Sequence, residues 1–191
     1  MNYEGKKFDK LMLEQEKVEE VIFSGCEFHH CEFYELEIIN ASFRDCTFDG
    51  CTLLNNKFKF TDAINNTFNR CNLIGVNWAD LTRKKGVFLP FDKLNECTIK
   101  HNVFYKFRMK KIDFQDCDLT GSVFEQCDLQ ESKFQRTELS EAVFDNNDLR
   151  GADFRLAQNY AISLENNNLK KAKFSFPEAI NLLTAIGINV E

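Results

Sequence analysis

The sequence predicts a solenoid, a protein built from one short structural repeat that is stacked many times. Three observations support this prediction. An apolar residue recurs every five positions, a small residue lies two positions before it, and the composition is enriched in the corresponding residue types. The 191 residues include 20 Phe and 8 Cys but only 2 Pro. Neither an α-helix nor an ordinary strand repeats every five residues. A single short repeat cannot bury its large side chain alone, so stacking is needed for stability.

The five-residue period covers most of the chain in two runs. Every fifth residue is apolar in the range 8–78, and after a slip of one residue the period continues over 94–174. In the second run the large position is polar only at Asn159, for which Tyr160 is the candidate substitute. Fifteen of the 20 Phe lie at the large position, and all eight Cys lie two residues earlier. We therefore expect these two positions to form the core.

The repeats resemble those of a known family. Segments such as CDLTGSVFEQCDLQE (117–131) and NDLRGADFRL (147–156) are similar to the units of pentapeptide repeat proteins. The resemblance implies an all-β, right-handed quadrilateral β-helix, in which each pentapeptide makes one face and four make a coil. About eight coils spaced by roughly 4.8 Å would result. The expected domains are a β-helix over 1–174 and a capping or dimerisation segment over 175–191.

One stretch interrupts the repeats between the two runs. The distance from Trp78 to Leu94 is three units plus one residue, and Gly86, Pro90 and several charges fall between them. Gly, Pro and charged residues indicate a projecting loop at about 79–88. The loop is either a tolerated surface insertion or a partner-binding element, because loops on rigid scaffolds often carry function. The candidate contact residues are Asp80, Leu81, Thr82, Arg83, Lys84, Lys85 and Gly86.

The C-terminal segment has helical rather than five-residue spacing. Ser175, Pro177 and Glu178 are typical of a helix start, and Gly187 is typical of a helix end. The helix either covers the open last coil or joins two copies. Its sequence resembles the ending of Qnr-type quinolone-resistance proteins and of their mycobacterial relative MfpA, which implies an end-to-end homodimer. The candidate interface residues are Ile180, Leu182, Leu183, Ile186, Ile188 and Val190.

Eight cysteines raise the alternatives of a metal site and of disulfides. Their spacings are multiples of five within each run, and all lie at the inward small position. We therefore expect buried free thiols, with no metal and no cofactor. The three histidines, His29, His30 and His101, are expected at the surface, and the sequence contains no catalytic motif. We also expect the Phe-rich interior to leave no cleft, so an enzyme is not predicted.

The outward positions show two charge patterns when they are aligned on a twenty-residue coil. Lys93, Asp113, Lys133, Asp153 and Lys173 alternate in sign, which predicts a ladder of weak ion pairs. A second column is uniformly acidic, with Lys106 and Lys170 as the main nearby counter-charges. It is either a solvated acidic edge or a mimic of DNA phosphates that would fit a basic DNA-binding surface. Its residues are Glu125, Asp128, Asp145, Asp148 and Glu165.

The charge distribution and the resemblance together set the functional hypotheses. The net charge is −6, and neither half of the chain has an excess of basic residues, so direct nucleic-acid binding is not expected. No apolar run is long enough to span a membrane, the first residues lack the features of a signal peptide, and we expect a cytoplasmic protein. The Qnr resemblance implies a DNA-mimicking rod that binds DNA gyrase or topoisomerase IV and protects it from quinolones or a gyrase-directed toxin. The alternative is a pentapeptide-repeat scaffold with an unrelated partner.

Overall fold

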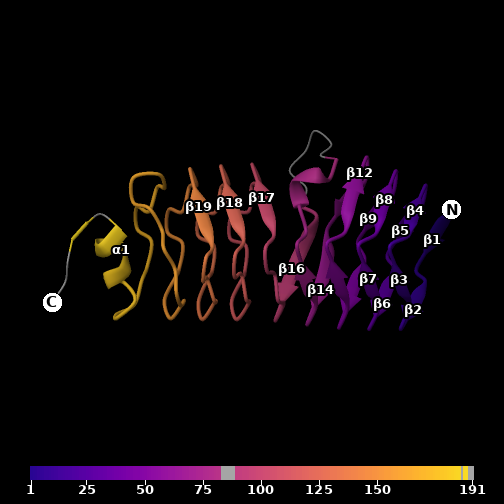
Figure 1. Cartoon of the computed structure of the whole chain (residues 1–191), viewed down its shortest axis with the longest axis horizontal. Helices are drawn as coiled ribbons and strands as arrows, with labels where there is room; N and C mark the ends of the chain where they lie inside the picture. Colours follow the sequence, from indigo (N-terminus) through magenta and orange to yellow (C-terminus); the bar gives the residue numbers. More distant parts are fainter. Residues whose placement is uncertain (83–88, 186, 189–191) are drawn as a thin grey trace. The chain divides into compact units, whose positions relative to one another are not determined.

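The computed structural model describes residues 1–82, 89–185 and 187–188. It contains short parallel strands and one short helix, and it forms an all-β solenoid, which confirms the predicted fold class (Figure 1). The solenoid has about seven turns, where the sequence predicted about eight coils. The chain divides into two compact units, Met1–Thr98 and Ile99–Glu191. No helix in the described ranges is both long and apolar enough to cross a membrane.

The N-terminal unit has four parallel sheets, one for each face of the coil. The first contains, in order, β1 (Asn2–Glu4), β5 (Ile22–Ser24), β9 (Ser42–Arg44) and β13 (Asp62–Ile64). The second contains β2 (Lys7–Asp9), β6 (Glu27–His29), β10 (Thr47–Asp49), β14 (Asn66–Asn69) and β16 (Phe91–Asn95). The third contains β3 (Met12–Glu14), β7 (Glu32–Tyr34), β11 (Thr52–Leu54) and β15 (Asn72–Ile74). The fourth contains β4 (Lys17–Glu19), β8 (Glu37–Ile39) and β12 (Lys57–Lys59).

Residues twenty apart are strand partners, as the repeat predicts. Phe28, Phe48 and Phe68 are in register on neighbouring strands, and their rings stack with centroids 4.6 and 4.8 Å apart. Most corners between faces have a residue with a left-handed backbone, such as Lys10 at φ 53° and Phe60 at φ 52°. These corners turn the chain from one face to the next while the large side chain stays inside.

The interruption between the two repeat runs begins later than the sequence predicts. Residues Trp78–Asp80 form a short 3₁₀ helix, and the Thr82 amide donates to the Thr61 carbonyl of the preceding coil at 2.7 Å. Residues 79–82 therefore still follow the solenoid, and residues 83–88 lie outside the described ranges. The one-residue phase slip corresponds to a bulge, because β14 pairs Asn66 with Phe91 but Thr67 with Lys93.

The C-terminal unit has one continuous sheet and three faces joined by isolated bridges. The sheet contains β17 (Val103–Tyr105), β18 (Val123–Glu125) and β19 (Val143–Asp145). On another face, Phe114, Phe134 and Phe154 stack with centroid separations of 5.4 and 4.6 Å. Tyr160 is only 2% exposed, so it replaces the exposed Asn159 in the core as anticipated.

The unit ends in α1 (Ile180–Ala185), which is shorter than the helix that the sequence predicts. The preceding residues form turns instead, because the amides of Ile180 and Asn181 donate to carbonyls only three residues earlier. The helix therefore begins three residues after Pro177.

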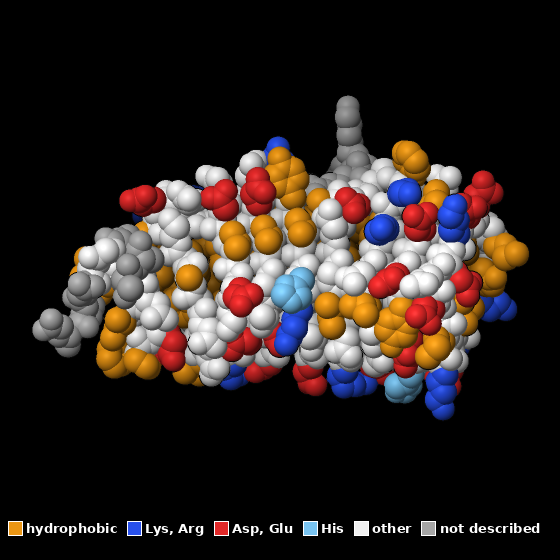
Figure 2. Space-filling model, in the orientation of Figure 1, with side chains coloured by type: hydrophobic (Ala, Val, Ile, Leu, Met, Phe, Trp, Pro, Cys, Tyr) orange, Lys and Arg blue, Asp and Glu red, His pale blue; other side chains and the backbone are white. Residues whose placement is uncertain are grey.

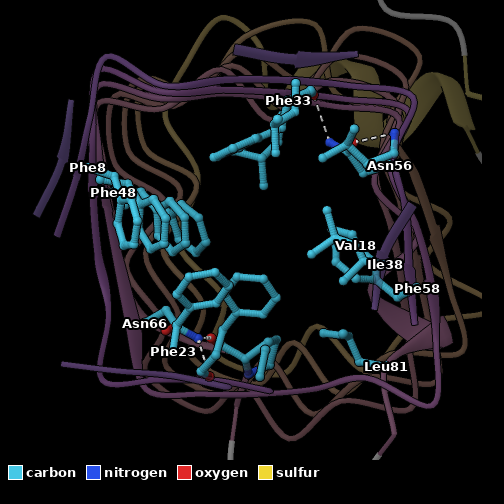
Figure 3. Close-up of a pocket in the computed structure, with 18 of the residues that line it drawn as sticks. Phe8, Val18, Phe23, Phe33, Ile38, Phe48, Asn56, Phe58, Asn66 and Leu81 are labelled. Atoms are coloured by element: carbon cyan, nitrogen blue, oxygen red, sulfur yellow. Dashed lines mark hydrogen bonds between the residues drawn. The ribbon is translucent and has the colours of Figure 1, made fainter. Parts of the chain in front are cut away.

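One expectation about the interior was wrong. The N-terminal unit encloses an apolar cavity of about 90 Å³, which we call the lumen. Figure 3 shows the lumen with inward side chains on all sides, including Phe23, Phe33 and Ile38. The lining extends from Phe8 of the first coil to Leu81 and Pro90. Phe at many large positions therefore does not fill the interior of this unit.

Candidate partner-binding surfaces

The described part of the predicted loop offers two exposed residues. Asp80 is exposed at the end of the 3₁₀ helix, where the side-chain amide of Asn77 donates to its carboxylate at 2.9 Å. Thr82 is also exposed. Leu81, however, is only 6% exposed and lines the lumen, so its side chain belongs to the core and is not open to a partner. Arg83, Lys84, Lys85 and Gly86 lie outside the described residues.

Two residues of the predicted acidic strip lie side by side on the sheet β17–β18–β19. Glu125 and Asp145 are in register on β18 and β19. Their carboxylates accept hydrogen bonds from neutral amides, from Gln126 at 3.3 Å, from Asn146 at 2.8 Å and from Asn166 at 3.2 Å. These amide contacts orient the carboxylates and leave their negative charge in place. Glu165 is exposed in a turn of the following coil.

The second pair of the strip is partly neutralised. Asp128 and Asp148 are bridge partners on the next face. The guanidinium of Arg150 donates to both carboxylate oxygens of Asp148, with an Nη2–Oδ2 distance of 2.6 Å. These bonds hold the pKa of Asp148 below its usual value. Arg150 is a counter-charge that the sequence analysis missed, so the strip has less net negative charge than its five carboxylates suggest.

The acidic residues lie next to an apolar ladder on the same sheet. Val103, Val123 and Val143 are in register on β17, β18 and β19, at the outward position two residues before Tyr105, Glu125 and Asp145. Val143 is 49% exposed. Figure 2 shows apolar side chains in a row over this sheet, with acidic side chains beside them. The twenty-residue spacing of the valines was a visible signal for this ladder.

Part of the predicted alternating ladder is present on another face, as two ion pairs. Lys133 contacts Asp113 at 2.9 Å and Lys173 approaches Asp153 at 3.9 Å. Asp153 also accepts two hydrogen bonds from Arg155, which lower the pKa of this aspartate. Because these charges compensate one another, this face is a structural element and not a candidate anionic surface.

The cysteines confirm their predicted role as core residues. All eight are free and buried. The thiol of Cys127, for example, lies 3.3 Å from the carbonyl of Phe104. Burial raises the pKa of Cys46 to about 11, which disfavours the reactive thiolate. Within the residues that the structure describes, no cluster of His, Cys, Asp and Glu is arranged to hold a metal ion.

The predicted dimer residues are partly exposed on and after α1. Ile180 and Leu182 are half-buried, while Leu183 and Ile188 are 39% and 46% exposed. The amide of Ile188 donates to the carbonyl of Leu183 at 3.0 Å, so the chain after the helix folds back toward it. Ile186 and Val190 lie outside the described residues.

Comparison with known proteins agrees with this geometry. The family model of the pentapeptide repeat region matches residues 104–174. Two structures of trypsin-treated QnrB1, a plasmid-mediated fluoroquinolone resistance protein, are similar over the whole chain. One has a TM-score of 0.68 and 18% identity and covers 100% of this chain and 98% of the other. The second has a TM-score of 0.63 and 16% identity and covers 100% of both chains.

A search of the curated proteins found no match. At identities of 18% and 16%, the TM-scores of 0.68 and 0.63 show a shared fold. Residues 104–174 are therefore a pentapeptide repeat region, and the chain as a whole has the fold of the pentapeptide repeat proteins.

Proposed function

We propose that this protein binds DNA gyrase, with topoisomerase IV as a second target, and protects it from quinolones or from a gyrase-directed toxin. The proposal rests mainly on the acidic residues of the sheet β17–β18–β19. Glu125 and Asp145 are adjacent rungs of that sheet, separated by about 4.8 Å, so their linear charge density is of the same order as that of one DNA strand, which has one charge per ~3.4 Å of helix axis. A surface that binds DNA phosphates would attract such a ladder. The fold shared with QnrB1, itself a fluoroquinolone resistance protein, supports the same proposal.

The valine ladder adds a second component to the proposed interface. Val123 and Val143 lie directly beside the two carboxylates, so a partner that covers the acidic residues also covers apolar surface. Burial of apolar area contributes about 25 cal/mol per Å², which charge alone does not provide. Acidic and apolar side chains together therefore favour a protein partner, which buries both, over a partner that contacts the charges alone.

A supercoiling assay tests the proposal directly. Gyrase is assayed with ciprofloxacin in the presence and absence of micromolar protein, and binding to gyrase is measured in parallel. The double variant Glu125→Gln with Asp145→Asn should weaken binding and protection about tenfold or more. The matched control, Glu14→Gln with Glu20→Gln, removes the same charge from exposed positions of the first coil and should behave as wild type. The absence of both rescue and binding would refute the proposal, and a pull-down without topoisomerase subunits would favour an unrelated partner.

We also infer that α1 joins two copies of the chain. The exposed apolar side chains of Leu183 and Ile188 support this inference, because a second copy would remove them from water. Light scattering measures the molar mass of the wild type and of Leu183→Asp. The substitution should convert a dimer into a monomer, whereas Asn181→Asp, at an exposed position of the same helix, should not. A monomeric wild type at micromolar concentration would contradict the inference.

A further inference from the structure

A small residue at a large position is one of the residues that line the lumen of the N-terminal unit. On the first sheet, Tyr3, Phe23 and Phe43 stack with ring centroids 5.2 and 5.1 Å apart. The next strand places Ala63 in register with Phe43, so the column of rings stops there. On the second sheet the rings continue to Phe68. The missing ring leaves space inside the coil, because neighbouring side chains collapse only partly into such a gap.

The lining of the lumen is apolar, and its two polar residues are already satisfied. Asn56 donates to the Phe33 carbonyl at 2.9 Å and accepts from the Leu36 amide at 2.9 Å. Asn66 likewise donates to the Phe43 carbonyl at 3.1 Å and accepts from a backbone amide at 3.0 Å. Both amides thus face the backbone, as the dashed lines in Figure 3 show. A molecule in the lumen would find no hydrogen-bond partner there.

The lumen is accessible from one end of the unit. At that end it is lined by Phe8, Leu13 and Val18 of the first coil, which are half-buried. At the other end it is lined by Trp78 and Leu81, which are 3% and 6% exposed. Phe23, Phe33 and Phe43 point inward and are nevertheless only half-buried, so solvent-sized molecules reach them within the coil.

We propose that the lumen is a binding site for a small, uncharged, hydrocarbon-like molecule, no larger than one aromatic ring or a short alkyl group. Its volume of about 90 Å³ is below that of the engineered apolar cavity of about 150 Å³ that stays dry and binds benzene and xenon. It is also far below the roughly 300–1,000 Å³ of drug-binding pockets, so the lumen does not store a quinolone. The site is independent of the proposed gyrase interface, which lies in the other unit.

Xenon and benzene binding to the full chain test this proposal. The ¹²⁹Xe chemical shift, the fluorescence of the single tryptophan at the end of the lumen and the melting temperature are measured during titration. Both molecules should bind with saturation and should raise the melting temperature. Phenol should bind about tenfold more weakly than benzene, because its hydroxyl would lose its hydrogen bonds to water without replacement. Equal affinities for phenol and benzene, or no saturable binding of xenon, would overturn the proposal.

Substitutions of two alanine residues locate the site. Ala63→Phe continues the column of rings, so it should fill the lumen and reduce xenon and benzene affinity at least tenfold. Ala161→Phe adds the same ring at an exposed position of the other unit and should leave binding unchanged. If Ala63→Phe does not fold, Ala63→Val provides a smaller filling residue with a partial loss of affinity. Undiminished binding by a folded Ala63→Phe variant would place the ligand elsewhere and refute the assignment.

Discussion

Replacing Phe134 with alanine removes a ring from the middle of a buried stack in the C-terminal unit. Phe134 is fully buried, and its ring stacks on Phe114 at 5.4 Å and on Phe154 at 4.6 Å. Its edge also meets Phe124 and Phe144 at 6.1 and 5.8 Å. A buried Phe→Ala substitution typically costs about 3–5 kcal/mol. Four ring neighbours place Phe134 in the upper half of that range, near 4–5 kcal/mol.

The lumen provides an internal test of this magnitude. Phe23 also has four ring neighbours, but it is only half-buried against the lumen, so alanine there removes less buried apolar area and opens less new space, and we expect a cost of about 2 kcal/mol. Phe48 is 4% exposed in a continuous stack of the same unit and is the matched comparison, with an expected cost of about 4 kcal/mol. The expected loss of unfolding free energy is thus about twice as large for the core substitution as for the substitution beside the lumen.

Urea unfolding of the full chain, followed by circular dichroism, measures these free energies. Hydrogen exchange read by mass spectrometry assigns each loss to its own unit, because a solenoid opens locally as well as globally. A neutral Phe134→Ala variant would refute the assignment of the large position to the core. Equal losses of unfolding free energy for Phe23→Ala and Phe48→Ala would contradict the presence of an unfilled lumen beside Phe23.

Three further outcomes are expected. Phe60 is 78% exposed with a left-handed backbone, so Phe60→Gly should gain up to about 1 kcal/mol in urea unfolding, whereas Phe60→Ala should be neutral because it keeps the Cβ. The eight buried thiols should not react with a thiol reagent until the chain unfolds, and fast labelling of the native protein would contradict their packing. Arg155 lowers the pKa of Asp153, so the ionised carboxylate stabilises the fold above the ordinary pKa of about 4, and this contribution is lost as the pH falls through the lowered value. The stability difference between wild type and Asp153→Asn should therefore be present at pH 7 and disappear in acid, and a difference that persists at low pH would exclude this cause.

The sequence predicted the positions of the core well because the period of five gives every residue a fixed orientation. The slip before Leu94 was visible as one extra residue, and it is the bulge between β14 and β16. The lumen was missed because Ala63 satisfies a pattern of apolar residues while it lacks the volume of Phe. The ion pair of Arg150 with Asp148 was missed for another reason: it joins residues two apart along the chain, and aligning coils by twenty residues does not bring them together.

The sheet β17–β18–β19 presents carboxylates and valines, which would contribute to the proposed interface in different ways. Exposed charges act over a Debye length of about 8 Å at physiological salt, so the carboxylates of Glu125 and Asp145 act together on an approaching cationic surface. Such charges mainly raise the association rate, and salt weakens their effect. The valines at the same rungs act only on contact, and they should mainly slow dissociation. Neutralising the carboxylates should therefore reduce the association rate and its salt dependence, whereas Val123→Ser with Val143→Ser should increase the dissociation rate with little change in salt dependence. A change in the same rate constant for both pairs would contradict this division of the two contributions.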